Sequence, residues 1–405
     1  MASTSYNLKR TLKSNTIFLV LIAVMVLFQV LIVATGNGSL FAPQNVTNII
    51  KQNSYVVILA TGMLLCILTG GNIDLSVGSI VCLVGALAGT FIVTLGWNIY
   101  ASIFLCLIIG ILIGAWHGMW IAFIHIPPFI VTLAGMLLWR GVALIVLNGL
   151  TISPMPDKYL ALFNSSIPAI SDEEFDRIGF DAAQSRIFTV TMIIAVICCA
   201  IYIVIQFINR TGKIKKGYEV EPMGLFIGKL VILSAVILVV AGLLGQNEGL
   251  PVILILMAVI VAAYGYYTQN TVPGRYLYAL GGNAKAAQLS GVNTDKVMFF
   301  AYTNMGFLSA VAALVCIARF NSAAPTAGTN YEMDAISSCF IGGASAYGGT
   351  GTVGGAVVGA IFMGVLNNGM SILGVDSNWQ RAVKGLVLLL AVLFDVTSKR
   401  KKSGK

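Results

Sequence analysis

The sequence predicts an all-α polytopic membrane protein with about 10–12 transmembrane helices and with broken or re-entrant segments. Of its 405 residues, 58% are hydrophobic and 10% are charged, and the mean hydropathy is +0.92. A soluble domain is about one quarter charged, so this chain is too apolar for that class. The net charge of +9 comes from Lys and Arg that gather in the termini and in two loops. This distribution is typical of spans oriented in a bilayer beside anionic membrane lipid, and it argues against nucleic-acid binding.

Five spans are predicted in the first part of the chain. Basic N-terminal residues precede an apolar run that no cleavage site closes, so 17–35 is interpreted as an uncleaved first span with the N-terminus inside. A second span is expected over about 46–69. The glycine-rich segment Gly70–Ser79 then interrupts the helix, and a third span continues to about Leu95. The last two spans of this part cover about 99–124 and 127–147.

Polar segments alternate with spans in the middle of the chain. Residues 148–186 contain prolines and the acidic run Asp172–Glu174 but little positive charge, so they are predicted to form an extracytoplasmic loop. Residues 209–221 contain Arg210 and three lysines and are interpreted as a basic cytoplasmic loop. The spans of this part are expected over about 187–208, 225–244 and 251–268.

Residues 269–296 form a polar island that positive charge places on the cytoplasmic side. Pro273–Gly274 and Gly281–Gly282 are interpreted as turns. Between them and the next span, Asn283–Gly291 has the composition of a short helix, with Asn283 suited to its N-cap and Gly291 to the position after its end. A helix this short is unstable alone, so other parts of the chain or a partner must hold it. Docking of a soluble partner and an ordinary solvated loop are equally compatible with the pattern.

The last part of the chain combines complete spans with one broken segment. Residues 335–359 are rich in glycine and too short in their apolar part for a full span, which suggests a re-entrant element. The basic run Lys399–Lys402 keeps the C-terminus inside, as at the N-terminus. Spans are expected over about 297–319, 353–373 and 381–394, and an outside loop over 320–332. The glycine-rich stretches that begin at Gly70 and Gly342 look alike, through either an internal repeat or shared glycine bias.

A few polar residues inside the apolar stretches are candidate functional residues. Asp74, next to Ser76, is interpreted foremost as a cap for the third span and otherwise as part of a translocation pathway or gate, because a carboxylate at membrane depth is normally paired or functional. Asn304, Asn367 and Asn368 either line a polar route or, as the favoured alternative, bond between helices.

Several function classes lack their motifs in this sequence. There is no G-x-x-x-x-G-K-[ST] phosphate loop and no HExxH zinc motif, and the seven Cys show no metal-ligand spacing. We therefore expect neither a catalytic residue nor a metal in this chain. One convincing buried carboxylate is few for an ion-coupled secondary sugar carrier, which remains the alternative interpretation. A lipid-handling membrane enzyme is a weaker alternative, because no catalytic cluster is evident.

Four motifs, which together cover most of the chain, resemble the permease subunits of bacterial monosaccharide ABC importers of the ribose, galactose and xylose group. The extra polar stretch and span pair between Asn148 and Val252 make the chain most similar to the xylose-type or multiple-sugar permeases. The motifs are GGNIDLSVGSIVCLVGALAG, PPFIVTLAGMLLWRG, GRYLYALGGNAKAAQLSGV and CFIGGASAYGGTGTVGGAVVGAIFMGVLNNGMSILGV.

The resemblance implies a function and a set of partners. Residues 1–405 would form a single transmembrane permease domain in the bacterial inner membrane. Its partners would be a second permease copy, an ABC ATPase with two nucleotide-binding halves that holds ATP and Mg, and an extracytoplasmic sugar-binding protein facing the outside loops. In such importers a helix in a cytoplasmic loop docks on the ATPase. The matching coupling positions here are Gly274, Arg275, Asn283, Ala284, Ala287, Leu289 and Gly291.

Overall fold

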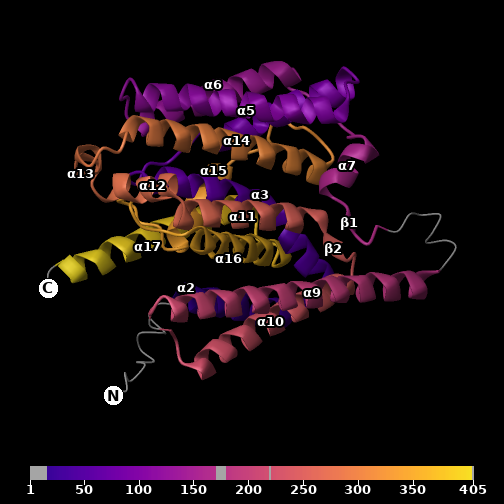
Figure 1. Cartoon of the computed structure of the whole chain (residues 1–405). Helices are drawn as coiled ribbons and strands as arrows, with labels where there is room; N and C mark the ends of the chain where they lie inside the picture. The colour runs from indigo at the N-terminus through magenta and orange to yellow at the C-terminus, as the bar shows by residue number, and fades with distance from the viewer. Residues whose placement is uncertain (1–15, 170–178, 219, 404–405) are drawn as a thin grey trace.

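The protein is a bundle of long helices, seen in a computed structural model that describes residues 16–169, 179–218 and 220–403 (Figure 1). The helices of the first half are α2 (Thr16–Ala34), α3 (Pro43–Leu68), α4 (Val77–Gly89), the π-helix η1 (Thr90–Thr94), α5 (Ile99–Ala122), α6 (Pro128–Leu147) and α7 (Asp157–Phe163). Those of the second half are α9 (Phe180–Lys215), α10 (Met223–Gly245), α11 (Val252–Asn270), α12 (Val272–Gly282), α13 (Ala284–Leu289), α14 (Thr294–Phe320), α15 (Tyr331–Ile341), α16 (Val353–Ile372) and α17 (Ser377–Ser403).

The helix lengths confirm the polytopic prediction. Counted over the described residues, ten helices are long and apolar enough to cross a membrane. A further helix, α17, has 27 residues but carries Arg381, Lys384 and Asp395. The expected broken element is α15, whose 11 residues are too few to span a bilayer and are followed by an irregular glycine-rich segment over 342–352.

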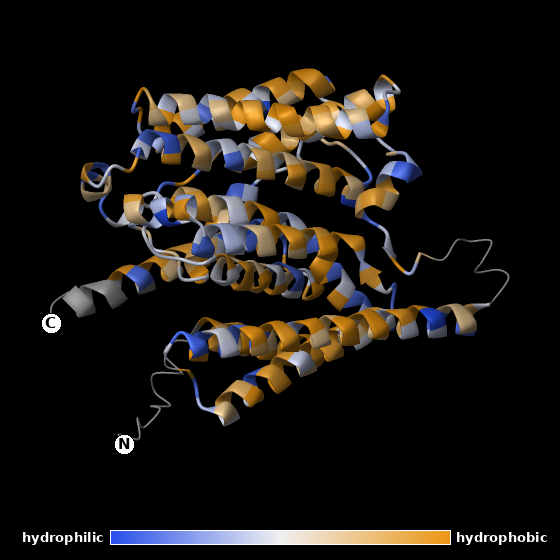
Figure 2. Ribbon diagram, in the orientation of Figure 1, coloured by the Kyte–Doolittle hydropathy of each residue, from blue (hydrophilic) through white to orange (hydrophobic). Residues whose placement is uncertain are grey.

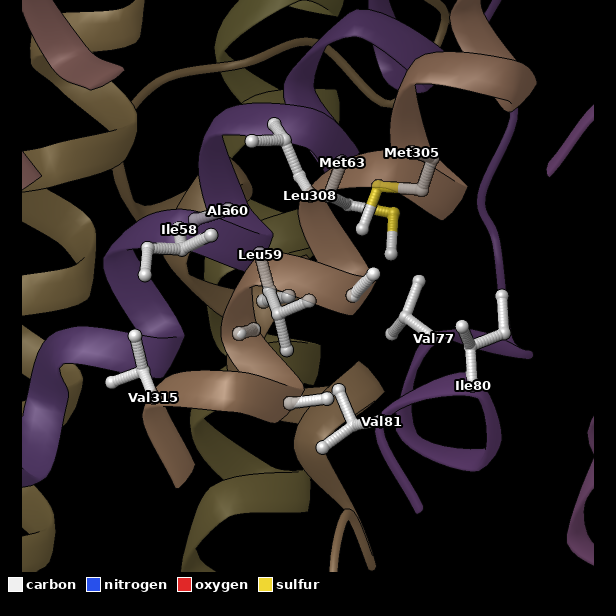
Figure 3. Packing of buried hydrophobic residues seen from close by; sticks show 14 of the residues in the cluster. Ile58, Leu59, Ala60, Met63, Val77, Ile80, Val81, Met305, Leu308 and Val315 are labelled. Atoms are coloured by element: carbon white, nitrogen blue, oxygen red, sulfur yellow. The ribbon is translucent and has the colours of Figure 1, made fainter. Parts of the chain in front are cut away.

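The core of the bundle is built by α3, α4, α14 and α16, whose apolar windows are each more than 70% buried. Side chains from α3, α4 and α14 converge there, among them Leu59, Val81 and Leu308 (Figure 3). Because lipid is as apolar as these side chains, close packing rather than escape from water holds such helices together. The sequence supplies the required small residues, as where Gly306 of α14 crosses Gly110 of α5.

The irregular segments gather at the two ends of the bundle (Figure 1). One end holds α7 and the two-stranded ladder of β1 (Ser166–Ile167) and β2 (Leu250–Pro251). The opposite end holds α12, α13, the end of α9 and the C-terminal end of α17. The segments assigned from charge to one side of the membrane therefore lie together.

Three predicted loops are partly helical. The basic loop over 209–221 is wrong in its first half, because α9 continues to Lys215. The helix continues through Gly212 and ends before Gly217, whose φ is +75°, and basic residues stabilise its last turn. Residues 272–282 form α12 instead of two turns, because proline fits the first turn of a helix.

The expected loop over 148–186 also contains helices. It includes α7, and α9 begins within it at Phe180, after Gly179. The first part of this segment packs onto the end of α14, where the buried Tyr159 hydroxyl donates to the Leu314 carbonyl at 2.6 Å. The acidic run Asp172–Glu174 lies outside the described residues, so its proposed exposure stays a prediction.

Candidate functional site: a helix pair seated on two glycine loops

The short helix α13 matches the local chemistry expected of it. The Asn283 side-chain oxygen accepts a hydrogen bond from the Ala286 N–H at 3.0 Å, which caps the helix. The helix ends before Gly291, whose φ of +85° suits glycine better than any other residue. Both local predictions are confirmed, and the helix is held at its two ends by its own sequence.

The apolar side chains of α13 point in different directions. Ala287 is 6% exposed and packs against the chain, whereas Leu289 is 82% exposed. An α-helix turns about 100° per residue, so these two side chains point about 200° apart. Although Ala284, Ala287 and Leu289 were all expected to be coupling positions, they do not form one apolar face that a groove of the partner could cover. Leu289 alone offers a large apolar side chain to the outside, and Ala284 is exposed on another side of the helix.

The preceding helix α12 is seated on the body of the bundle. A Cβ placed on Gly281 would lie 1.9 Å from the Leu68 carbonyl oxygen and 2.4 Å from the Gly349 nitrogen. The Tyr278 hydroxyl donates to the Gly351 carbonyl at 3.0 Å, and Gly274 is buried against the end of α11. Arg275 is exposed on the same helix. Sequence reasoning took Gly281 for a turn residue, whereas the structure needs it for backbone contact.

The two similar glycine-rich stretches meet beneath α12. A Cβ on Gly71 would lie 2.0 Å from the Ala346 carbonyl oxygen, and one on Gly348 would lie 2.5 Å from the Gly70 Cα. The Gly349 N–H also donates to the Leu68 carbonyl at 3.1 Å. The loops after α3 and after α15 therefore contact each other and α12. A displacement of α12 would affect the positions of both loops.

Asp74 lies inside this arrangement, at the start of α4. Its Oδ1 accepts hydrogen bonds from the Ser76 N–H at 2.8 Å and from the Ser76 hydroxyl at 2.5 Å, and the residue is fully buried. These bonds fit the interpretation of Asp74 as a cap for the third span. Within the described part of the chain, its Oδ2 is buried without a hydrogen-bond partner.

Two substitutions of Asp74 test whether its hydrogen bonds to Ser76 are needed for transport. Asp74→Asn keeps an oxygen acceptor for Ser76, so we expect folded protein with partial transport. Asp74→Leu leaves the buried Ser76 N–H and hydroxyl unpaired, which costs about 1–3 kcal/mol for each group, and we expect transport to be lost. Uptake per folded molecule measures transport by the two variants, and thermal unfolding in detergent is the control for their stability. Equal and full activity of the two variants would remove Asp74 from the mechanism.

Two asparagines of the predicted polar route form hydrogen bonds between helices. Asn304 accepts a hydrogen bond from the Tyr264 hydroxyl of α11, and the Asn368 amide donates to the Asn45 side chain of α3 at 2.9 Å. These bonds join neighbouring helices, as the favoured alternative expected. Asn367 neighbours Asn368 near the end of α16. Within the described part of the chain, no hydrogen bond joins the three asparagines to Asp74 or Ser76, and the route stays a prediction.

His117 of α5 is a buried packing residue. It accepts a hydrogen bond from the Trp139 indole at 3.2 Å through Nε2, and a Cβ on Gly135 would lie 2.1 Å from that atom. Gly135 therefore makes room for the imidazole. This arrangement is that of a core histidine, fully buried between α5 and α6.

A cavity of about 690 Å³ lies between α2, α3, α10, α11 and α16. Asn53 is the polar side chain in an otherwise aliphatic and aromatic lining that includes Val57, Val239 and Met257. A sugar buried there would leave most hydroxyls without partners, so this cavity does not suit a monosaccharide. Among the described residues, no three His, Cys, Asp or Glu side chains come together as a metal site.

Fold and site together define a helical membrane permease, and sequence comparison agrees. Residues 45–392 match the family described as branched-chain amino acid transport system / permease component, and the chain belongs to this family. No solved structure matches the chain.

The curated relatives that match are named as sugar permeases. The chain is 35% identical to the xylose transport system permease protein XylH of Escherichia coli over 94% of this chain and 92% of the relative. It is 34% identical to XylH of Haemophilus influenzae, over 95% of this chain and 97% of the relative. The ribose import permease protein RbsC of Escherichia coli is 34% identical over 93% and 92% of the two chains. The chain is thus a transport subunit and not an enzyme, and the ion-coupled carrier finds no support.

Proposed function

We propose that this chain forms the translocation pathway of an ATP-driven importer for a monosaccharide, such as xylose or a related pentose or hexose. The observation that carries the proposal is its similarity, over more than 90% of both chains, to relatives named for xylose and ribose transport. The family description mentions branched-chain amino acids, but the full-length relatives given above are named for sugars.

The proposal includes partners and a location. An ABC ATPase with two nucleotide-binding halves would hold ATP and Mg, while this chain itself binds no cofactor. A second copy of the chain would complete the pore, and an extracytoplasmic binding protein would deliver sugar at the end that holds α7 and residues 320–332. The chain would lie in the bacterial inner membrane with both termini cytoplasmic, which the clustering of basic residues supports.

The coupling route runs from α13 to the glycine loops. The ATPase would bind the exposed Leu289, and the exposed Arg275, Asn283 and Ala284 would be further contact positions. Movement of α13 would pass through Ala287 and Gly291 to the helices on either side. The movement would then pass through α12 to the loop after α3. At this point Gly281 is in direct backbone contact with the loop, with no room for a side chain between them. Since Asp74 holds the start of α4 beside that loop, these contacts offer a direct mechanical path from ATPase to spans.

Uptake by the reconstituted importer tests the function. We expect the purified chain to bring an ATPase with it. With the cognate binding protein, vesicles should accumulate labelled pentose or hexose when ATP is supplied, and an ionophore that removes ion gradients should have no effect. The same vesicles offered labelled leucine serve as the control for the family description. Uptake driven by an ion gradient without ATP would contradict the proposal.

A further inference from the structure

The helix hairpin formed by α9 and α10 leaves most of its apolar surface uncovered by the rest of the described chain. Only 17% of the apolar window of each helix is buried, and orange apolar residues cover both helices in Figure 2. At the end shared by α12 and α13, the hairpin carries a polar cavity of about 410 Å³, here called the hairpin pocket. Its polar lining comes from Gln206, Asn209, Arg210, Lys213, Glu221 and Lys229.

Helix length places the hairpin pocket at the membrane surface. With 36 residues, α9 is about 54 Å long, whereas the hydrocarbon core is about 30 Å thick. The apolar run of α9 ends at Ile208, and the charged lining of the pocket begins just after it, at Arg210. The pocket therefore lies where the phosphates of one leaflet lie, and the proposed orientation makes this the cytoplasmic leaflet.

The charge of this region favours an anion. Residues 209–229 contain five basic and two acidic side chains. Lys229 is held by Glu221 through contacts of 2.5 and 2.7 Å, and the Arg210 guanidinium lies 4.8 Å from the centre of the Phe226 ring, which fixes its position. Among the described lining residues, Glu221 is the one carboxylate, against three basic groups.

The first turn of α10 adds backbone donors to the same place. This helix begins at Met223 after Pro222, and no described side chain caps it. Its first N–H groups therefore remain available, and the N-terminus of a helix attracts phosphate. Phe226, in this first turn, lines the pocket, which places the N-terminus next to Arg210.

We propose that the hairpin pocket binds the phosphate of an anionic phospholipid, such as phosphatidylglycerol, and so anchors the hairpin in its leaflet. Arg210 and Lys213 bind the phosphate, with Lys229 and the α10 N-terminus completing the site. The acyl chains lie along exposed apolar side chains that precede the pocket on α9, such as Ile205. A free phosphate ion would gain none of this apolar contact, so the site selects a lipid over a soluble anion.

Lipid retention by the full chain tests the site with a charge-matched control. The pocket pair is Arg210→Gln with Lys213→Gln. The control pair is Lys215→Gln with Lys216→Gln, which removes the same charge from the same segment outside the pocket lining. Native mass spectrometry of protein purified from vesicles of phosphatidylglycerol and phosphatidylcholine reports the retained lipid. We expect the pocket pair to bind phosphatidylglycerol about tenfold or more weakly, the effect of losing a charge-assisted hydrogen bond, and the control pair to keep it.

Two further measurements distinguish lipid phosphate from free phosphate, and loss of the site from a folding defect. Millimolar inorganic phosphate should not displace the lipid, and Arg210→Lys, which keeps the charge and the fold, should retain lipid partly. Equal loss from both pairs would show diffuse charge attraction and overturn the site. Equal retention of phosphatidylcholine by the unaltered chain, or displacement by phosphate, would also overturn it. Because retention is measured without transport, its failure is distinct from a failure of the proposed import function.

Discussion

Replacing Leu289 with Asp is expected to stop sugar uptake while the permease still folds and inserts. The side chain is 82% exposed, so the isolated chain loses no core contact. In a groove of the ATPase, loss of a well-packed leucine costs about 2–5 kcal/mol, and a buried charge adds to this. A typical coupling energy between sites is about 1–3 kcal/mol, so the change is large enough to uncouple the two proteins.

The neighbouring Gln288 provides the matched control. It is exposed on the same helix, and Gln288→Asp introduces the same charge one residue away from the leucine. Co-purification of the ATPase and uptake in vesicles should both fall for Leu289→Asp and remain near normal for Gln288→Asp. Gly291→Val should resemble the leucine variant, because its φ of +85° resists a β-branched residue although the surrounding space is open. Full ATPase binding and uptake by Leu289→Asp would show that α13 is a passive connection.

Local chemistry predicted α13 well because its signals lie within nine residues. Asn283 and Gly291 perform the roles that their side chains, or lack of one, favour wherever a helix starts or ends. The apolar spans were equally predictable from the sequence, because the thickness of the bilayer requires long apolar runs. The opposite directions of the Ala287 and Leu289 side chains could also have been predicted, because two residues correspond to about 200° of rotation in a helix.

Contacts between segments distant in the chain could not be predicted from local sequence in this way. Gly281 signals a turn as readily as a close approach, and only the position of Leu68 and Gly349 distinguishes the two. Asn304 and Asn368 each bond to a neighbouring helix that the sequence does not specify. The polar route was inferred from residue type alone, and residue type cannot tell an interhelical bond from a pathway lining.

The crossing of α5 and α14 gives a second large expected effect, on stability. Alanine normally stabilises a helix by about 0.5–1 kcal/mol relative to glycine. At Gly306, however, the added Cβ would lie 2.3 Å from the Gly110 carbonyl oxygen and 2.7 Å from the Gly114 Cα, all backbone atoms of a fixed helix. Relief requires the two helices to separate, and overpacking of this kind costs about 1–3 kcal/mol.

Gly141 of α6 is the matched glycine for this test, because a Cβ there meets nothing within 4 Å. We expect Gly306→Ala to lower the unfolding temperature and the yield of folded protein, and Gly141→Ala to leave both unchanged or raise them. Opposite signs from one identical substitution cannot come from helix propensity, so they isolate the contact between α5 and α14. Thermal unfolding in detergent measures the difference. Equal behaviour of the two variants would mean that the helices do not need this approach, and that their small residues serve some other purpose.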